Sequence, residues 1–151
     1  MKNKILEVSA IKDGTVIDHI PADSLFKVIS ILRLENIKGM ITFGTNLKSQ
    51  RLGKKGIIKL SDVFFKDKDI NRISLIAPDA KLNIIRDYKV VEKKVVEVPD
   101  EISGIAKCVN PMCITNHEQV ETKFKVVDKK EIKLRCHYCE KITDKEHMEI
   151  L

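Results

Sequence analysis

The feature that most constrains this chain is the placement of its four cysteines. They are Cys108, Cys113, Cys136 and Cys139, and the first 107 residues contain none. The pattern is C-x4-C-x22-C-x2-C, two close pairs that 22 residues separate. A tight turn can aim both sulfurs of a pair at one point, and a β-hairpin between the pairs can bring the two turns together. Because four thiolates in a tetrahedron suit Zn²⁺, the sequence predicts one structural zinc ion at these cysteines.

Other interpretations of the cysteines stay open at this point. Four buried thiols can cluster without any metal, and four thiolates can also hold an iron–sulfur centre. His137 lies inside the second pair and could replace a sulfur ligand, although we expect its ring to point outward. A catalytic zinc is disfavoured, because four protein thiolates leave no open coordination position. The local clustering favours a metal site in a reducing compartment over a disulfide framework.

We expect two domains, residues 1–98 and residues 99–151, with the boundary at Val98-Pro99-Asp100-Glu101. The second is expected to be a small all-β domain with short strands over residues 105–107, 119–127, 131–135 and 147–150. A domain of this size buries little apolar surface. Metal binding should therefore supply much of its folding free energy, on the order of 10 kcal/mol.

The first domain has the pattern of an α+β fold. Apolar residues recur with helical spacing over residues 24–36 and 69–77, and extended runs lie between and around these segments. We expect strands over residues 4–11, 15–20, 40–47, 57–65, 81–86 and 88–98, and a loop over residues 53–56. Counting the first two runs as one unit, the order β-α-β-β-α-β-β predicts a ferredoxin-like antiparallel sheet with two helices on one face. The expected core consists of Leu6, Val8, Val16, Leu25, Ile29, Leu32, Ile41, Ile58, Ile73, Ile76, Ile84 and Val90.

Charge is distributed unevenly between the two parts. Residues 1–97 carry 19 basic and 12 acidic side chains, a net charge of +7, whereas residues 98–151 carry 9 and 10, a net charge of −1. A basic excess in the first part favours an anionic ligand there, with a solvated lysine-rich surface as the alternative. The loop Gly53-Lys54-Lys55-Gly56 lacks the glycine spacing and the Lys-Ser/Thr pair of a phosphate-binding P-loop.

Several classes of function are disfavoured by composition. No apolar run approaches the roughly 18 residues of a membrane span, and the first residues lack the apolar stretch of a signal peptide. We therefore expect a cytoplasmic protein without a membrane partner. Aromatic residues make up 5% of the chain, which offers few base-stacking side chains for a nucleic-acid partner. The four histidines belong to no recognisable catalytic pattern, so we expect a protein that is not an enzyme.

Longer motifs carry a resemblance that extends over nearly the whole chain. They are A-I-K-D-G-T-V-I-D-H-I-P-A at residues 10–22, G-x-N-L at 44–47, G-x-K-x-x-I-K at 53–59 and A-P-x-A-x-x-N-x-I-x-x-Y-x-V-V-x-K at 77–93. The cysteine segments C-x4-C-I and C-x-Y-C-E-K follow in the same register. In these motifs the chain resembles the regulatory chains of aspartate carbamoyltransferase.

The resemblance implies that the ferredoxin-like domain binds CTP or ATP at one shared site. Asp18 and Lys59 match the positions that contact the ribose. The positions at the phosphate end are matched by His19, Val90 and Lys93, with Lys55 beside them. Backbone groups that read the base edge are matched by Ala10, Ile11 and Tyr88. The pocket wall is matched by Val16, Asn83 and Ile85.

The resemblance also implies protein partners. The zinc domain of this family docks on the catalytic chain, and the positions near that contact are matched by Asn110, Tyr138, Glu140 and Lys141. The N-terminal domains form regulatory homodimers, and three dimers link two catalytic trimers in an enzyme of pyrimidine biosynthesis. A bound nucleotide then shifts the equilibrium between a tense and a relaxed assembly.

Three residues depart from the family pattern. Ser9 stands in place of an acidic residue and Val95 in place of a basic residue near the nucleotide site. Met112 stands in place of a polar residue in the first cysteine loop. We expect the first two to affect effector selectivity or affinity, and the third to remove one hydrogen bond with the catalytic chain.

Overall fold

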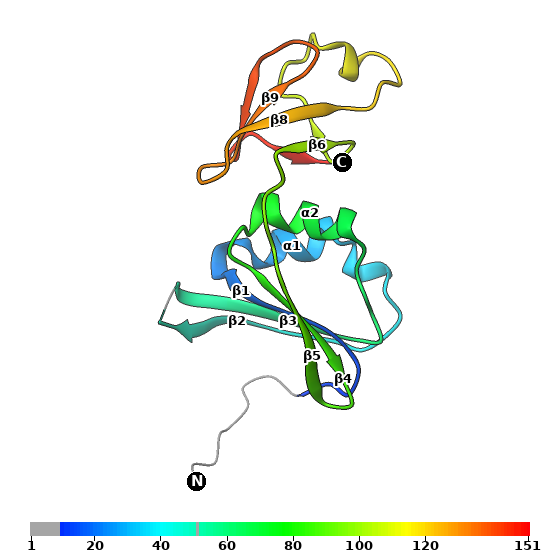
Figure 1. Cartoon of the computed structure of the whole chain (residues 1–151), viewed down its shortest axis with the longest axis vertical. Coiled ribbons are helices and arrows are strands. Elements are labelled where there is room, and N and C mark those ends of the chain that lie inside the picture. Colours follow the sequence, from blue (N-terminus) through cyan, green and yellow to red (C-terminus); the bar gives the residue numbers. More distant parts are fainter. Residues whose placement is uncertain (1–9, 51) are drawn as a thin grey trace. The chain divides into compact units, whose positions relative to one another are not determined.

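The first part of the chain is built on one antiparallel sheet of five strands, in the order β2-β3-β1-β4-β5 (Figure 1). The computed structural model describes residues 10–50 and 52–151. Most of the strand predicted over residues 4–11 lies outside these residues, and Ala10 and Ile11 are not in a strand. The five strands are β1 (Gly14–Pro21), β2 (Ile41–Ser49), β3 (Gly53–Ser61), β4 (Lys81–Arg86) and β5 (Lys89–Val95).

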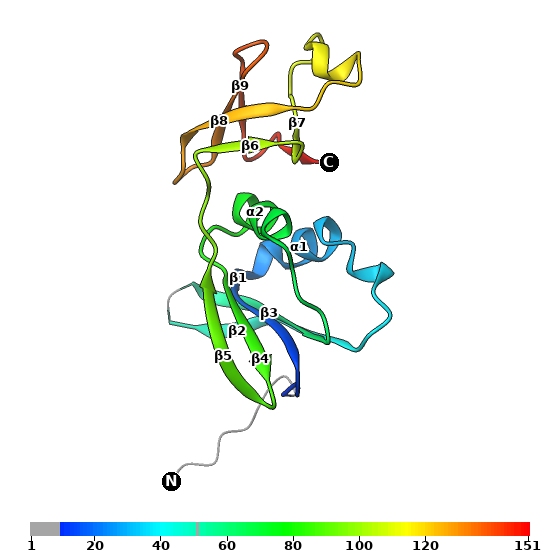
Figure 2. The same cartoon turned by 45° about the vertical axis from the view of Figure 1, so that its right-hand side comes forward.

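Two helices cover one face of this sheet, and no helix of the described residues lies on the other face, called the open face below (Figures 1 and 2). They are α1 (Leu25–Ile31) and α2 (Asp67–Ile76), and short 3-10 turns at Ala22–Ser24 and Leu34–Asn36 flank α1. The predicted α+β, ferredoxin-like arrangement of two helices on an antiparallel sheet is confirmed.

The period-two alternation of the strands decides which residues form the core. Ile17, Ile58 and Leu82 are register partners across three strands, and all are buried on the helix-covered side. Val16 precedes Ile17 and therefore points to the opposite, open face. The predicted core was wrong at Val90, which is 48% exposed, and four further members are only half-buried: Ile29, Leu32, Ile41 and Ile84. Leu6 and Val8 of that predicted core lie outside the described residues.

Two expected boundaries were also wrong. The helix predicted to run to about Asn36 ends at Ile31, because Arg33 adopts a left-handed conformation with φ 52° and breaks the helical path. The predicted loop over residues 53–56 is the beginning of β3, where Lys55 pairs with Leu47 and Gly53 pairs with Ser49. The long hairpin formed by β2 and β3 provides the backbone partners that the polar sequence did not suggest.

A β-bulge interrupts β1 near its end. Ile17 pairs with Ile58 and Ile20 pairs with Gly56, so Asp18 and His19 stand opposite one residue of β3. His19 takes a positive φ of 59° there. A bulge bends its strand and re-aims the side chains at that point. Asp18 and His19 are thereby presented together at one end of the sheet.

The second part of the chain, residues 97–151, is a separate unit made only of short strands and turns. Its main sheet has the order β10-β9-β8-β6, from β6 (Glu101–Ser103), β8 (Lys123–Asp128), β9 (Lys133–Cys136) and β10 (Ile142–Asp144). A smaller sheet pairs β7 (Ala106–Lys107) with β11 (Glu149–Ile150). β6 and β10 were not predicted. Each has only three residues, two of them polar, which is too short to show an alternation of apolar and polar side chains.

The described part of the chain contains no helix long and apolar enough to cross a membrane.

Gly14 offers a sharp test of the sheet. Its φ is 140°, and a Cβ atom there would lie 1.9 Å from the carbonyl oxygen of Leu60. We expect Gly14→Ala to lower the free energy of unfolding of the first unit by about 2 kcal/mol or more, because the strand must shift away from β3. Chemical denaturation measures this difference.

The matched control is Gly53→Ala. Gly53 also has a positive φ, 77°, but an added Cβ would meet nothing within 4 Å. Only the backbone cost of about 1 kcal/mol is therefore expected. Equal losses in the two variants would contradict the close contact with Leu60.

Candidate functional site

The four cysteines of the second unit meet in one cluster. Cys108 follows β7, Cys113 precedes the 3-10 turn at Ile114–Asn116, Cys136 is the last residue of β9, and Cys139 lies in the next turn. Their four sulfur atoms all lie within 4.8 Å of one another, with 3.6 Å between Cys108 and Cys139 and 3.7 Å between Cys113 and Cys136. Cys139 is half-buried and the other three are buried. Four soft ligands around one point form a site for a metal ion.

Each cysteine pair sits on a backbone turn. The amide of Cys113 donates to the carbonyl of Asn110 at 3.0 Å, and the amide of Glu140 donates to the carbonyl of Cys136 at 3.0 Å. Glu140 takes a positive φ of 64°, which closes the second turn. The two sulfurs of each pair can therefore face the same point.

Supporting residues that the sequence did not single out hold the first turn. The side-chain amide of Asn116 donates to the carbonyls of Cys108 and Asn110, at 3.1 and 2.7 Å. Thr115 donates its hydroxyl to the sulfur of Cys113 at 3.2 Å. The buried hydroxyl of Thr143, on β10, accepts from the amide of Val109 at 3.3 Å. Such contacts orient metal ligands. Neither the types nor the spacing of the three supporting residues would have predicted this role from the sequence.

Without a cation the cluster cannot hold four negative charges. Burial raises the pKa of the Cys108 thiol to about 12 and also raises the pKa of Cys136. Burial also opposes ionisation of Cys139, but hydrogen bonds from the Lys141 backbone and from Asn110 outweigh it and lower the Cys139 pKa to about 7. A bound metal ion compensates the charge of four thiolates, so ion and ligand set fit one another.

The open face of the first sheet carries most of the residues proposed to contact a ligand. Lys59 pairs with Val16, Val16 with Asn83, and Asn83 with Lys93, so these four side chains form one row across β3, β1, β4 and β5. Val16 is buried and Lys93 is exposed, with the other two between these extremes. β3, β1, β4 and β5 are neighbouring strands (Figures 1 and 2), and strand alternation places the row on the open face.

Asp18 organises the cationic end of this face. Its carboxylate lies 2.8 Å from the amino group of Lys55 and 3.3 Å from Nδ1 of His19, and it accepts from the His19 amide at 2.7 Å. Burial lowers the pKa of Lys59, and the charge of Asp18 partly opposes that shift. One carboxylate therefore interacts with three basic side chains, which remain close together without strong mutual repulsion.

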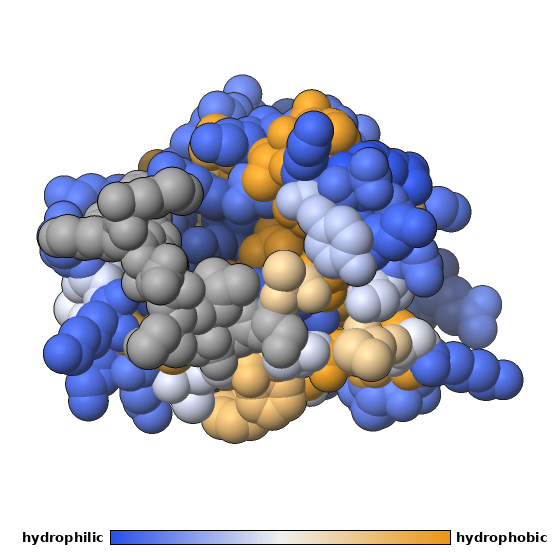
Figure 3. Space-filling model, turned by 90° about the horizontal axis from the view of Figure 1, so that it is seen from below, coloured by the Kyte–Doolittle hydropathy of each residue, from blue (hydrophilic) through white to orange (hydrophobic). Residues whose placement is uncertain are grey.

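Apolar side chains form the floor of the same face. Ile11, Val16 and Ile85 make a small buried cluster, and Ile57 packs against it. Figure 3 shows hydrophobic side chains near the middle of the molecule seen from below, between hydrophilic side chains on both sides. This face therefore has an apolar centre with basic side chains on one side, which suits a ligand with a flat apolar part and an anionic tail.

The remaining predicted ligand positions lie around this cluster. The amide of Tyr88, in the turn between β4 and β5, donates to the carbonyl of Lys12 at 2.9 Å, which ties that turn to the segment containing Ala10 and Ile11. Val90 pairs with Ile85 and points to the same face.

The four positions proposed to contact another chain lie on the two cysteine turns. Asn110 belongs to the first turn, and Tyr138, Glu140 and Lys141 belong to the second. The ring of Tyr138 meets the ring of His137 edge to face, with centroids 5.1 Å apart. Among the described residues the metal-binding group contains the four cysteines and not His137. Met112 is strongly exposed, and its amide donates to the Asn110 side chain at 3.0 Å.

Comparisons with known proteins identify both units. Residues 6–97 match the family model described as aspartate carbamoyltransferase regulatory chain, allosteric domain. Residues 100–149 match the metal-binding domain of the same regulatory chain. Both descriptions are of regulatory domains, in agreement with the prediction of a chain that is not itself an enzyme.

Curated relatives match along nearly the full length. An aspartate carbamoyltransferase regulatory chain of Bacteroides thetaiotaomicron is 58% identical over 146 residues, which cover 97% of this chain and 95% of the relative. The one of Porphyromonas gingivalis is 50% identical over 151 residues, all of both chains. The one of Pyrococcus abyssi is 53% identical over 145 residues, 95% of both. These matches confirm the resemblance found in the sequence motifs.

Proposed function

Because this chain belongs to the family of aspartate carbamoyltransferase regulatory chains, we propose that it senses CTP and ATP in the cytoplasm and passes their effect to the catalytic chain of that enzyme. The first unit is the sensor and the second unit is the docking module. The observation that carries the proposal is the open sheet face, where a row of polar and basic side chains crosses an apolar floor beside Asp18.

The chemistry of a nucleoside triphosphate fits this face part by part. The apolar floor of Ile11, Val16 and Ile85 offers a surface for the base. The Tyr88 amide already donates to Lys12, so the Tyr88 carbonyl and backbone groups near Ala10 are the ones proposed to read the edge of the base. Asp18 can accept hydrogen bonds from ribose hydroxyls, with Lys59 beside it. The phosphates then reach cations, which form the strongest hydrogen bonds with anionic oxygens. The residues proposed for this end are His19, Lys55, Val90 and Lys93, with Asn83 in the wall.

The proposed metal is zinc. A tetrahedron of thiolates at the usual zinc–sulfur distance of about 2.3 Å has edges of about 3.8 Å. The two short sulfur–sulfur distances, 3.6 and 3.7 Å, approach that value. All four sulfurs lie within 4.8 Å, which leaves room for one ion rather than a multi-iron cluster. With four protein ligands the ion has no open position, so its role is to join the two cysteine turns.

A homodimer through the edge of β2 is also part of the proposal. β2 is an edge strand, and its outer backbone groups have no strand partner among the described residues. Phe43 on β2 meets Phe26 on α1 edge to face, 5.9 Å between centroids, and both rings are exposed, as is Met40. A long edge with an apolar patch is protected when a second copy covers it.

Regulation requires a difference in affinity between two states of the assembly. A nucleotide shifts the equilibrium of the catalytic chains only if it binds one state more tightly than the other. Coupling of this kind usually amounts to about 1–3 kcal/mol.

Nucleotide binding is tested by calorimetric titration of the metal-loaded chain. CTP and ATP should compete for one site, and Lys59→Ala and Lys93→Ala should each weaken both by about tenfold or more, since a hydrogen bond to a charged group contributes roughly 1.5–3 kcal/mol. Lys94→Ala is the matched control, because Lys94 lies on the same strand, points to the opposite face and pairs with Leu82. Equal losses of nucleotide affinity in Lys93→Ala and Lys94→Ala would contradict the assignment of the nucleotide site to the open face.

Metal removal tests the second unit. We expect one zinc ion per chain by elemental analysis, and chelation should unfold residues 99–151 while the first unit keeps its structure. Amide NMR spectra distinguish the two units, and added zinc should restore the lost signals. An unchanged spectrum of the second unit after complete removal of the metal would refute a structural role.

The dimer is tested at its apolar edge. Phe43→Glu should shift the free chain from dimer to monomer in light scattering, because a charge then faces the second copy. Phe64→Glu is a control, since Phe64 is also exposed but lies beneath Arg86, 4.1 Å from its ring centre. A dimer that persists in Phe43→Glu would place the contact elsewhere.

A further inference from the structure

The main sheet of the second unit has one buried face and one basic face. Along β8 the side chains alternate, with Phe124 and Val126 buried and Lys123 and Lys125 exposed. β9 repeats this alternation, because Leu134 and Cys136 are buried and the residue between them, Arg135, is exposed. Strand register therefore places Lys125 and Arg135 directly opposite each other on the exposed face.

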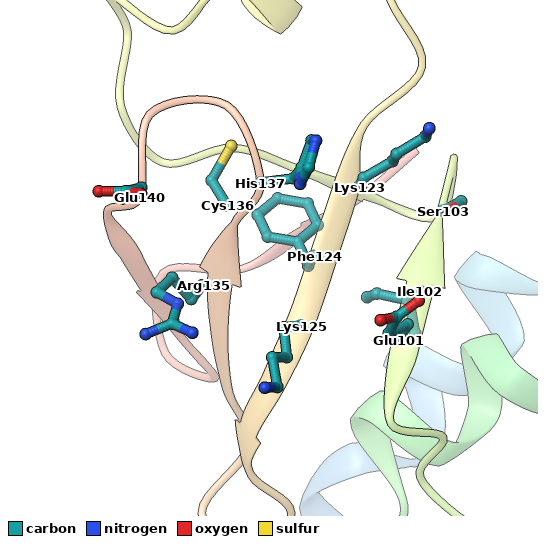
Figure 4. A pocket seen from close by; sticks show the side chains of 10 residues that line it. All are labelled: Glu101, Ile102, Ser103, Lys123, Phe124, Lys125, Arg135, Cys136, His137 and Glu140. Carbon is teal, nitrogen blue, oxygen red and sulfur yellow. The ribbon is translucent and has the colours of Figure 1, made fainter.

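This face is hollowed. The hollow has a volume of about 700 Å³, and Lys123, Lys125 and Arg135 line it together with His137 and two carboxylates, Glu101 and Glu140. Figure 4 shows Arg135, Lys125 and Glu101 extending from three neighbouring strands. We name this feature the basic hollow. Neither the cysteine pattern nor the family motifs pointed to it.

The arrangement of charge is costly for the isolated unit. Like charges directly opposite each other on two strands destabilise a sheet. Within the described part of the chain, the ion pairs of this unit join Lys107 to Glu149, Lys129 to Asp100 and His147 to Asp144. Glu101 stands opposite Lys125 on its other side, whereas Arg135 is flanked by Lys125 and the uncharged Ile142. The unit is slightly acidic as a whole, with 9 basic and 11 acidic side chains over residues 97–151, a net charge of −2. Three of its nine lysine and arginine side chains nevertheless line this one hollow.

We propose that the basic hollow binds an acidic surface segment of the catalytic chain, an inference that rests on the docking proposed above. The hollow is continuous with the proposed docking residues, because Glu140 lines it and His137 contacts Tyr138. A carboxylate-bearing segment would lie between Lys125 and Arg135 and relieve their repulsion. Complementary charge of this kind raises the rate of association and fixes the register of two surfaces.

A protein partner fits the hollow better than a nucleic acid does. Glu101 and Glu140 stand at its sides and would repel a continuous phosphate backbone, whereas discrete carboxylates can be placed between them. Of the two aromatic rings in its lining, Phe124 is buried, which leaves only the imidazole of His137 for a stacked base.

The test measures association of the full metal-loaded chain with catalytic trimers from the same organism, at several salt concentrations. Lys125→Glu/Arg135→Glu should weaken association at least tenfold at low salt and flatten its dependence on salt, because screened attractions are lost. The matched control, Lys130→Glu/Lys145→Glu, makes the same change in net charge at exposed positions outside the hollow, and should stay within about twofold. Amide NMR spectra of each variant verify that the metal unit remains folded.

Carbodiimide cross-linking of the wild-type complex independently identifies the lysines that contact carboxylates of the catalytic chain. It should join Lys123 or Lys125 to an aspartate or glutamate of the catalytic chain, but leave Lys145 unlinked.

Three results would overturn the inference. If the hollow variant binds like wild type while Lys141→Glu, a change at a docking position outside the hollow, loses binding, the docking proposal stands and the basic hollow has no part in it. If wild type does not associate with the trimers at all, both the docking proposal and the proposed role of the basic hollow are refuted. If a 20-nucleotide single-stranded RNA binds wild type and not the hollow variant, the face is a nucleic-acid site.

Discussion

Both units depend on sheets that bury one face and leave the other free. In the first unit, the helices cover Ile17, Ile58 and Leu82, and the residues between them in sequence point to the opposite side. In the second unit, Phe124 and Cys136 are buried and the alternate side chains are exposed. Stability comes from one set of side chains, and the proposed recognition would come from the other. Substitutions on the open faces can therefore change binding with little effect on the fold.

The bulge in β1 decides where the ligand face has its charge. Without it, strict alternation would put Asp18 and His19 on opposite faces. Two residues standing opposite one allow the His19 amide to bond the Asp18 carboxylate, while Lys55 reaches the same carboxylate from β3. The positive φ of His19 is the local cost of this geometry. Strain of this kind is often retained at sites that bind ligands.

Much of this architecture could be predicted from the sequence. Helical and strand periodicity gave the α+β order, and the C-x4-C-x22-C-x2-C spacing predicted that four sulfurs would meet. The errors fall where tertiary contacts override local preference. The segment from Gly53 to Gly56 is too polar to suggest a strand, yet its hairpin partner pairs it, and Arg33 ends a helix whose apolar pattern continues. Asn116 and Thr143, which hydrogen-bond the backbone of the first cysteine turn, could not be predicted from the sequence. A single hydrogen bond produces neither a periodic pattern nor a motif.

The metal site and the basic hollow are mechanically linked through the β8–β9 hairpin. Cys136 pairs with Phe124, and the adjacent pair is Arg135 with Lys125. A metal ion that fixes Cys136 therefore also fixes the spacing of the two opposed cations one step along the strands. Those cations repel each other, so the hairpin keeps its register only if other interactions hold the strands together. A metal ion bound to Cys136 would do so at the end of β9. In the proposed assembly the ion would thus do more than fold a small domain: it would hold the charges of the docking surface at the separation that an acidic partner requires.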